Sequence, residues 1–504
     1  MFSQYSTDVC LGNPGRRFDL IVDTGSSITA VPCSNCKQCG MHHCGRTGCF
    51  DIGRSLSVQT LSCKRPPSGF SCERCYSGEK CGYSVHYTEG SSIQGHVVTD
   101  YAHFMRSKRV LSVDDADSGG GATSLALSTR VYFGCQTLET GMFFKQEADG
   151  IMGMQPPRAR SRVPSMLSSL VTQRGAIETF SLCLADRSGL FLLGGRPGYS
   201  SMRRLSALTV PMERGARARY TLSLKEVRVS GSGSANGTFR PLNLPASTYA
   251  PTLVDSGTTF VYASTPLFHA IHAHVRQHTP SLTREGGKVC AFLTQAQLDS
   301  MPSLQLVFGA VPSQPLLVRP RQYMVEFPKA GMRTAAHRHY CVAVFDNQRG
   351  GTVIGASIMR QREVIFDIAG STISFVNADC TSITPATSHL VDAYSFAPCP
   401  PRNATNNPSA SGAGGGGGGG GWLAQGLASA RSFASGAGWS SARAGGASEN
   451  GKGAMGGQSA GAHSASSPNR VGRLLPGGGG RSTLRSVMRS RGRAGVGRGG
   501  NGYS

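Results

Sequence analysis

Two short segments of closely similar sequence constrain the fold of this 504-residue chain more than any other feature. They are Asp23-Thr24-Gly25-Ser26-Ser27 and Asp255-Ser256-Gly257-Thr258-Thr259, and each follows an apolar, strand-like run. The glycine two residues after each aspartate suits a tight turn that another backbone approaches closely. Two such loops predict a pseudo-symmetric pair of carboxyl groups, Asp23 and Asp255. Because like charges at close range cannot both ionise, the pair would share one proton and supply a general acid and a general base.

A single Asp-x-Gly segment is weak evidence, because this sequence is common in ordinary turns. Two unrelated turns at strand ends are therefore the alternative interpretation. The repetition of the whole pattern in both halves of the chain favours two related lobes that each contribute one aspartate. Short strand-like runs separated by turn signals fill most of the body, with helix candidates at residues 164–172 and 266–277. We predict an all-β, bilobal protein.

Composition divides the chain into a body and a tail. From residue 384 onward the sequence is dominated by Gly, Ser, Ala and Arg, with an unbroken glycine run at residues 414–421. Such a segment buries too little apolar surface to offset its ordering entropy, so residues 384–504 are predicted to be disordered. We place an N-terminal lobe at residues 1–205 and a C-terminal lobe at residues 206–383.

The chain carries a formal net charge of +23, and part of this charge lies in the Arg-rich stretch 481–498 of the tail. This stretch could bind RNA or an acidic membrane surface. A solvated basic tail is the interpretation that we favour, because almost no aromatic residues interleave with these arginines. No nucleic acid is expected to bind the body.

Sixteen cysteines indicate an oxidising compartment. The spacing of Cys33, Cys36 and Cys39, with His42 and His43 nearby, also fits a zinc site. Disulfides are the preferred interpretation, because cysteines recur along the body. Their number in the N-terminal cluster is odd, so one of them pairs outside the cluster or stays free. The cluster consists of Cys33, Cys36, Cys39, Cys44, Cys49, Cys63, Cys72, Cys75 and Cys81.

Two sequons, at Asn236 and Asn403, agree with a secretory route. A secretory protein is expected to carry a signal peptide, yet strand-like sequence begins almost directly after Met1. We therefore expect a signal and any propeptide to precede this sequence. The sequence contains no apolar run long enough to span a membrane, so no membrane anchor is identified. The expected location is the lumen of the endoplasmic reticulum or Golgi.

The two loops and the body around them resemble the pepsin-like aspartic proteases. This resemblance implies a bilobal pepsin-like fold with a cysteine-rich insert in the N-terminal lobe. It also implies that Asp23 and Asp255 bind and activate one water molecule, which attacks the carbonyl of a peptide bond. Such catalysis is general acid–base chemistry without a covalent intermediate, a cofactor or a metal.

The resemblance assigns supporting roles to the residues around the two aspartates. Hydroxyl residues either lock the two loops together or bond the outer carboxylate oxygens, and glycines form the turns. Further glycines thread beside each loop. The supporting residues are Thr24, Gly25, Ser26, Ser256, Gly257 and Thr258, and the threading glycines are Gly153 and Gly355.

A hairpin with a Gly/Ser-rich tip is predicted at residues 83–95. Tyr87 lies where the family has the flap tyrosine, which closes over substrate and excludes water. A cross-strand aromatic residue without a catalytic part is the alternative interpretation. The family usually has a tryptophan that bonds this tyrosine, and Ala30 occupies that position here. That anchor of the flap is therefore absent.

Within the family, the closer resemblance is to the plasmepsin V-type proteases of apicomplexan parasites. It is carried by the cysteine string at residues 32–40, by Glu89 in the flap and by the segment 144–150. A cysteine-rich insert also occurs in the plant nepenthesin-like branch, so Glu89 is the feature that is more specific to the plasmepsin V type. The resemblance implies cleavage of exported effector proteins after the Leu of an Arg-x-Leu motif. Glu89 would pair with the substrate arginine and Gln146 would assist, with Glu147 as the alternative to Gln146.

A carboxylate on a closing flap can bond a guanidinium through two hydrogen bonds, which supports this role for Glu89. A solvated hairpin charge is the alternative. The plasmepsin V-type branch carries a cysteine after the flap tyrosine, where this chain has Thr88, so no thiol chemistry is expected there. Resemblance to pepsin-like disulfides implies the pairs Cys290–Cys341 and Cys183–Cys380.

We predict an aspartic endopeptidase of the secretory pathway that processes polypeptides with an Arg-x-Leu motif. A broad-specificity protease of nepenthesin type is the nearer alternative. A catalytically inactive, pepsin-like binding protein is a further alternative, which is disfavoured because both aspartates and their flanking hydroxyl residues are present. An RNA-associated role would rest on the basic tail alone.

Overall fold

The computed structural model describes most of the body of the chain. The described residues are 3–40, 49–67, 70, 72, 74–76, 78–87, 90–108, 123–156, 163–186, 188–197, 207–213, 219–231, 238–309, 311, 312, 314–327, 337–382, 390, 391, 393–397, 399 and 431–434. All of them belong to the first of the two units into which the chain divides, Met1–Ala447. Thr88, Glu89, both sequon asparagines and the glycine run lie outside the described residues.

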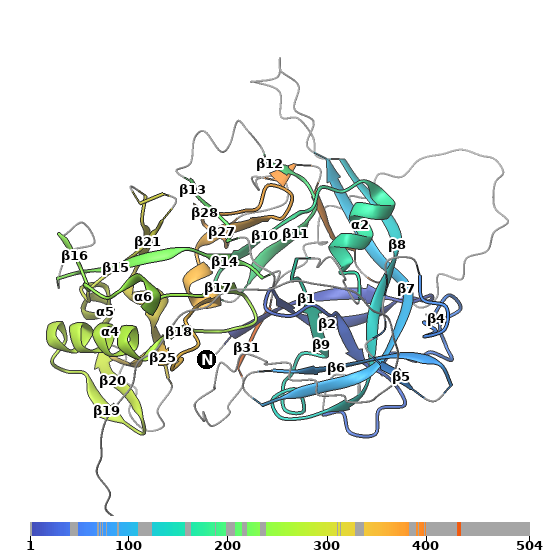
Figure 1. Ribbon diagram of the computed structural model, residues 1–504, viewed down its shortest axis with the longest axis horizontal. Coiled ribbons are helices and arrows are strands. Elements are labelled where there is room, and N and C mark those ends of the chain that lie inside the picture. The colour runs from blue at the N-terminus through green and yellow to red at the C-terminus, as the bar shows by residue number, and fades with distance from the viewer. Residues whose placement is uncertain are drawn as a thin grey trace, which may run out of the picture. The chain divides into compact units, whose positions relative to one another are not determined.

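The protein is built mainly from β-strands, and one 16-stranded sheet contains strands from both halves of the chain (Figure 1). Its order is β13-β28-β27-β10-β11-β30-β7-β8-β3-β9-β2-β1-β31, with β4, β5 and β6 pairing off this path. The strands from the N-terminal half are β1 Ser3–Leu11, β2 Arg16–Asp23, β3 Ala30–Pro32, β4 Gln59–Thr60, β5 Arg74–Tyr76, β6 Lys80–His86, β7 Ser92–Lys108, β8 Thr123–Glu139, β9 Gly150–Gly153, β10 Thr179–Leu184 and β11 Gly189–Leu193. The others are β13 Ala207–Pro211, β27 Arg362–Asp367, β28 Thr372–Asn377, β30 Ala393–Phe396 and β31 Arg431–Ala434.

The centre of this sheet joins the two halves of the chain. Strand β10 pairs antiparallel with β27, which places Phe180 opposite Phe366. Their rings stack with centroids 4.6 Å apart, and both side chains are fully buried. The ring of Tyr220 also packs here. Its buried hydroxyl donates a hydrogen bond of 2.6 Å to the carbonyl of Met154. A continuous apolar core therefore runs through the sheet from one half to the other.

The C-terminal half adds three smaller sheets. The first, which carries the second aspartate, has the order β14 Thr221–Leu222, β17 Thr252–Asp255, β26 Thr352–Gly355, β18 Val261–Ala263 and β25 Val344–Asp346. The second has the order β16 Phe239–Pro241, β15 Leu224–Ser230, β21 Leu304–Phe308 and β22 Leu316–Val318. The third has the order β19 Thr283–Glu285, β20 Lys288–Leu293, β24 Arg338–Val342 and β23 Met324–Glu326. A two-stranded pair, β12 Arg196–Pro197 with β29 Leu390–Val391, completes the strands.

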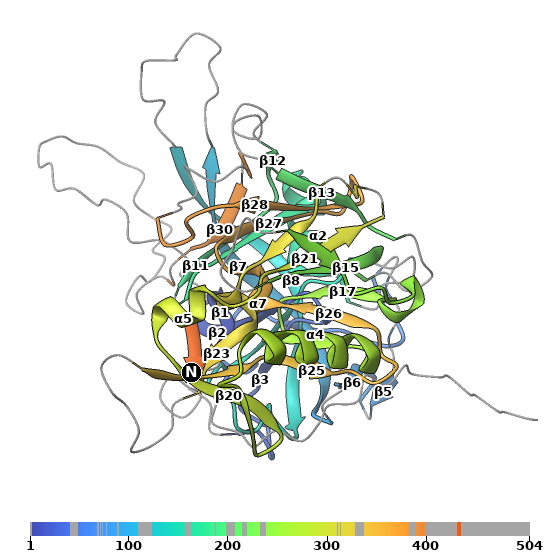
Figure 2. The same ribbon diagram turned by 90° about the vertical axis from the view of Figure 1, so that its left-hand side faces the viewer.

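The helices are few and short, as the strand-rich sequence predicts. Helix α4 begins with a proline in its first turn and buries Leu267, Ile271 and Val275, which share one face at the helical spacing. It lies across β25 (Figure 2). The side chain of Ser165 caps the start of α2, and Gly175 ends it in the left-handed conformation. The helices are α2 Met166–Arg174, α4 Thr265–His278, α5 Gln295–Asp299, α6 Pro320–Tyr323, α7 Ala356–Met359 and the 3-10 turn η1 Ala246–Thr248.

Disulfides, the preferred interpretation of the cysteine pattern, are confirmed. Cys33 bonds Cys135, outside the N-terminal cluster, and Cys36 bonds Cys39. These three sulfurs are therefore not available as zinc ligands. The pairs between described residues are Cys10–Cys399, Cys33–Cys135, Cys36–Cys39, Cys63–Cys75, Cys72–Cys81, Cys183–Cys380 and Cys290–Cys341, which include both pairs that the resemblance implies.

The folded body extends past residue 383, where composition placed its end. Strand β30 pairs with β7 and touches β11, so it lies inside the shared sheet. Tyr394 and Phe396 are buried there, and Cys399 forms a disulfide with Cys10 of β1. The region that composition assigns to the tail therefore begins with a segment that belongs to the core. Within the described part of the chain, no helix is both long enough and apolar enough to cross a lipid bilayer.

Candidate active site

The same strand arrangement occurs twice and places one aspartate at the end of each of two strands. Strand β2 ends at Asp23 and pairs in parallel with β9, so that Asp23 lies opposite Gly153. Strand β17 ends at Asp255 and pairs in parallel with β26, so that Asp255 lies opposite Gly355. The two threading glycines of the sequence analysis therefore occupy equivalent positions beside the two loops.

Four reciprocal hydrogen bonds lock the two loops to each other. The hydroxyl of Thr24 accepts from the Ser256 N–H at 2.9 Å and donates to the carbonyl of Val254 at 3.1 Å. The hydroxyl of Ser256 accepts from the Thr24 N–H at 3.1 Å and donates to the carbonyl of Val22 at 2.6 Å. Thr24 and Ser256 are both buried, so water does not compete for these bonds.

The two turn glycines let each carboxyl group approach the opposite loop. A methyl group at Gly25 would lie 2.7 Å from Oδ2 of Asp255, and one at Gly257 would lie 2.3 Å from Oδ1 of Asp23. Both distances are shorter than non-bonded atoms tolerate, so any larger residue would push the loops apart. The structure thus brings the two predicted aspartates face to face across two glycines.

Each carboxylate is held by the hydroxyl and the backbone of its own loop. Asp23 accepts from the hydroxyl of Ser26 through Oδ2 and from the N–H of Gly25 through Oδ1 at 2.7 Å. Asp255 accepts from the hydroxyl of Thr258 through Oδ2 at 2.7 Å. Its Oδ1 accepts from the N–H of Gly257 at 3.0 Å. These bonds fix the orientation of both carboxyl groups.

The two carboxyl groups differ in their exposure, and the surroundings of Asp23 shift its pKa. The Asp23 side chain is buried, with 6% of the residue exposed, whereas Asp255 is partly exposed. Burial raises the pKa of Asp23 well above its ordinary value, and the nearby Asp255 carboxyl raises it further. The hydrogen bonds from Ser26 and Gly25 act in the opposite direction. The surroundings of Asp23 thus favour the protonated form of its carboxyl group.

The predicted flap is a hairpin of β6 and β7, with Tyr87 at the start of its turn. The Tyr87 N–H donates to the carbonyl of Ser91 at 2.9 Å, and Gly90 turns the chain with a φ of +93°. The Tyr87 ring packs against the buried ring of Phe143, with centroids 4.8 Å apart. Ala30 is fully buried in β3. Phe143 therefore supports the tyrosine in a protein that lacks the family's tryptophan.

The structure places Gln146 on a loop that is bonded to the flap. Ser91 accepts a hydrogen bond of 2.8 Å from the Met142 N–H, and the Gln146 N–H donates to the Met142 carbonyl at 2.9 Å. The Gln146 side chain is buried and donates from Nε2 to the carbonyl of Ala148 at 3.2 Å. Glu147, the alternative residue, is exposed. Glu89, the predicted partner of Gln146, lies outside the described residues.

Two residues that support the site were not predicted from the sequence. Gln155 braces the first loop, because its side chain donates to the carbonyl of Gly25 and its N–H donates to that of Ser26. Phe143 contacts Tyr87, as described above. Gln155 follows the threading strand β9 by two residues, and this position is the one sequence signal that points to it.

One cluster of potential metal ligands occurs among the residues that the structure describes. It consists of Cys290, His339 and Cys341. The two sulfurs form a disulfide, so they do not offer thiolate ligands. Among the described residues, the Asp23–Asp255 pair is therefore the better candidate for a catalytic centre.

Thr24→Ala tests the lock between the loops. The substitution removes an acceptor from the Ser256 N–H and a donor from the Val254 carbonyl, both of them buried. We expect the free energy of unfolding to fall by about 2–4 kcal/mol. Thr24→Ser keeps the hydroxyl and should cost about 1 kcal/mol for the lost methyl group. Urea denaturation of the oxidised proteins measures both values, and equal losses would show that the hydroxyl does not lock the loops.

Comparison with protein families and individual proteins agrees with this geometry. Residues 5–195 match the family model described as xylanase inhibitor N-terminal, and residues 219–377 match the one described as xylanase inhibitor C-terminal. Each match contains one of the two loops, and together they span most of the body.

Individual relatives include proteins from parasites and from plants. Aspartic protease 5 of Toxoplasma gondii is 23% identical over 427 residues, which cover 76% of this chain and 37% of the relative. Plasmepsin V of Plasmodium falciparum is 27% identical over 202 residues, which cover 39% of this chain and 30% of the relative. Aspartic proteinase 36 of Arabidopsis thaliana is 23% identical over 407 residues, or 75% of this chain and 74% of the relative. The chain thus spans about a third of the two parasite relatives. Its paired aspartate loops and the two family matches show that this chain belongs to the pepsin-like aspartic proteases.

Proposed function

We propose that this chain is an aspartic endopeptidase that hydrolyses peptide bonds with Asp23 and Asp255. The observation that carries the proposal is the pair of facing carboxyl groups, of which Asp23 is buried in surroundings that raise its pKa. Both aspartates, both flanking hydroxyl residues and both turn glycines are in place. An inactive binding protein would have no need for this arrangement.

In the proposed reaction, the ionised Asp255 carboxylate takes a proton from a water molecule as its oxygen attacks the peptide carbonyl carbon. Protonated Asp23 donates its proton to the carbonyl oxygen, which gives a neutral tetrahedral diol. Asp255 then gives the proton that it took from water to the amide nitrogen, Asp23 takes a proton from one hydroxyl of the diol, and the C–N bond breaks. An amine and a carboxylic acid leave, and both aspartates are back in their starting states. The hydrogen bonds from Ser26 and Thr258 hold the two carboxyl groups in orientation during these transfers.

We further propose that the preferred substrates carry an Arg-x-Leu motif and are exported effector proteins. Glu89 lies between Tyr87 and Gly90 in the sequence of the flap turn, and Gln146 lies on the loop bonded to that flap. The Gln146 amide group donates to Ala148, and its oxygen can accept from a guanidinium. A carboxylate and an amide oxygen on adjoining segments suit an arginine side chain. The similarity to plasmepsin V and to Toxoplasma aspartic protease 5 supports this proposal.

Two other functions are distinguishable from this one. The first is a nepenthesin-type protease with broad specificity, and similarity to the plant relative Arabidopsis aspartic proteinase 36, of which the chain covers 74%, agrees with a protease of the plant branch. The family description as xylanase inhibitor supports a binding protein that does not cleave its partner. The peptide experiment below separates these three functions.

We propose that the protein works in the lumen of the secretory pathway. The support is its set of disulfides, which link segments that lie far apart in the sequence and would not persist in a reducing compartment.

Ser26→Ala tests the assignment of Asp23 as the acid. The Ser26 hydroxyl stabilises the ionised form of Asp23, so its removal raises the pKa of Asp23. The alkaline limb of the pH profile of kcat/KM should move to higher pH, because the acid keeps its proton longer. Ser27→Ala changes the exposed neighbour and should leave the limb in place. A limb that stays fixed or moves to lower pH in Ser26→Ala would contradict the assignment.

Phe143→Ala tests the support of the flap. Loss of the ring under Tyr87 should lower kcat/KM by about tenfold, as expected for an aromatic pair whose loss also opens a void. Phe144→Ala is the matched control, because Phe144 is 45% exposed, and it should stay within about twofold of the unmodified protein. If the two variants lose activity equally, the contact with Tyr87 does not order the flap.

Cleavage of matched peptides tests the arginine preference. We expect the full chain, produced under oxidising conditions, to cut an Arg-x-Leu peptide after Leu about tenfold faster than its Lys analogue. Glu89→Gln should reduce the Arg peptide to the level of the Lys peptide, whereas Glu147→Gln should not. Mass spectrometry identifies the cut, and Asp23→Ala should abolish it.

Equal cleavage of both peptides would favour broad specificity and contradict the arginine contact. No cleavage of either peptide by well-folded protein would contradict the endopeptidase proposal and favour the binding protein.

A further inference from the structure

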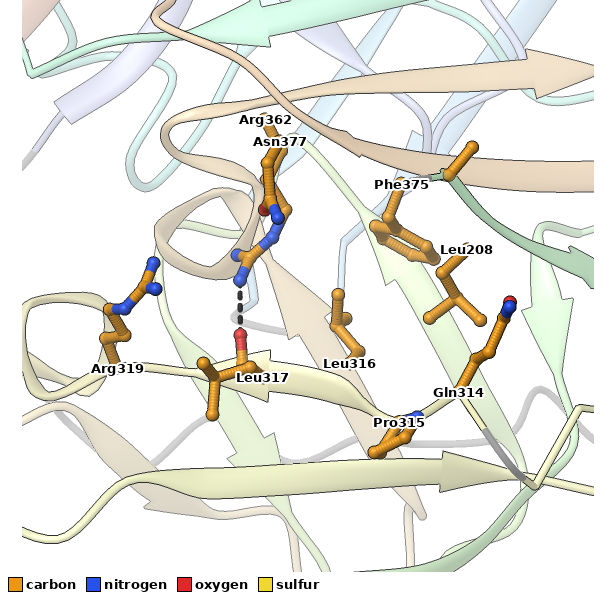
Figure 3. Close-up of a pocket in the computed structure, with 10 residues that line it drawn as sticks. Leu208, Gln314, Pro315, Leu316, Leu317, Arg319, Arg362, Phe375 and Asn377 are labelled. Carbon is orange, nitrogen blue, oxygen red and sulfur yellow. Dashed lines mark hydrogen bonds between the residues drawn. The ribbon is translucent and has the colours of Figure 1, made fainter. Parts of the chain in front are cut away.

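A pocket of about 200 Å³ lies in the C-terminal half, away from the two aspartate loops in the sequence of the chain. Strands β13, β27 and β28 of the shared sheet contribute one wall, and the segment around β22 contributes the other. The side chains divide the pocket into a cationic end and an apolar end (Figure 3). Neither end has a part in the proposed peptide hydrolysis.

Two arginines form the cationic end. Arg362 is 3% exposed and donates to two backbone carbonyls, that of Ile358 at 2.6 Å and that of Leu317. Arg319 is exposed, and its guanidinium makes no ion pair within the described part of the chain. No acidic side chain there pairs with Arg362 either. Two cations thus face one pocket without a carboxylate between them (Figure 3).

The buried guanidinium retains its charge. Burial lowers the pKa of Arg362 to about 10, and the charge of Arg319 acts in the same direction. At neutral pH the group is still protonated. Because a buried charge without a counter-charge is costly, an anion bound between the two arginines would be stabilised.

The other end of the pocket is apolar. Leu208, Leu316 and Phe375 point toward one another there, and Pro315 lies beside them (Figure 3). Leu208 and Phe375 are paired residues of β13 and β28, so this wall is part of a sheet and is rigidly held. The amide side chains of Gln314 and Asn377 also line the pocket. A ligand that satisfies both ends must carry a negative charge on an apolar body.

The volume limits the size of that ligand. A cavity of about 150 Å³ is large enough for benzene. The pocket therefore suits a group with the size of one aliphatic or aromatic amino-acid residue, and it is too small for a lipid or a nucleotide.

We propose that this pocket binds a small apolar carboxylate, with the carboxylate between Arg319 and Arg362 and the apolar group against Leu208, Leu316 and Phe375. An N-acylated apolar amino acid and the C-terminal residue of a peptide share this chemistry. The positive charge of the chain as a whole favours the approach of such an anion.

Isothermal titration calorimetry on the full-length Asp23→Ala protein tests the proposal without proteolysis of the probes. N-acetyl-leucine is expected to bind. N-acetyl-leucinamide, which lacks the charge, and N-acetyl-glycine, which lacks the apolar side chain, should each bind about tenfold more weakly or not at all. A pentapeptide that ends in a free leucine carboxylate identifies the source of the ligand. Binding as tight as that of N-acetyl-leucine assigns a peptide C-terminus, and weaker binding assigns a free acid; both results support the carboxylate chemistry.

Two surface variants locate the site. Arg319→Gln should weaken the binding of N-acetyl-leucine about tenfold. Arg284→Gln removes the same charge from an exposed position on β19, outside the pocket, and should leave the affinity unchanged. Arg362 is not substituted, because its buried hydrogen bonds contribute to folding. Equal binding of the acid and its amide, equal affinity in Arg319→Gln and the unmodified chain, or no binding of any probe at millimolar concentration would overturn the proposal.

Discussion

The pairing of the two aspartate loops depends on the reciprocal hydrogen bonds of Thr24 and Ser256. Each hydroxyl accepts from the opposite loop and donates to a carbonyl near the end of the opposite strand, so neither loop has its final shape without the other. Both residues are buried, which makes a broken bond costly. Because the two loops come from different halves of the chain, the aspartate pair is complete only where both halves are in contact.

The shared sheet provides the rigid support that this contact needs. Antiparallel pairing of β10 with β27 joins the halves, and the stacked rings of Phe180 and Phe366 fill the space beside that junction. Tyr220 bonds the carbonyl of Met154, and the N–H of Met154 donates to the carbonyl of Asp23 at 2.8 Å. A short chain of buried contacts thus runs from the core of the sheet to the first aspartate loop. The position of the Asp23 loop therefore depends on how the side chains pack in the core of the sheet.

Local sequence patterns predicted the all-β architecture and helices α2 and α4, but not the short helices α5, α6 and α7. The pair of aspartates was predicted from the repeated loop. Helix α4 was predicted because Pro266 suits the first turn of a helix, which is a local signal. Strand β30 and the Cys10–Cys399 disulfide were not predicted. The strand is short, and the Gly-, Ser- and Ala-rich segment that follows it dominates the composition of this region. The contact of Tyr87 with Phe143 joins two segments that no local pattern connects. Contacts of these kinds depend on how distant segments pair, which a local sequence pattern does not encode.

The two aspartate loops are similar in sequence and hydrogen bonding, yet an acid–base pair requires them to differ. The difference here comes from the surroundings. Asp23 is buried, whereas Asp255 is partly exposed, so the neutral form is favoured at Asp23. The proximity of Asp255 adds to this preference, because ionisation of one carboxyl group disfavours ionisation of the other. In the proposed reaction, this asymmetry in burial is what distinguishes the acid from the base in two nearly equivalent loops.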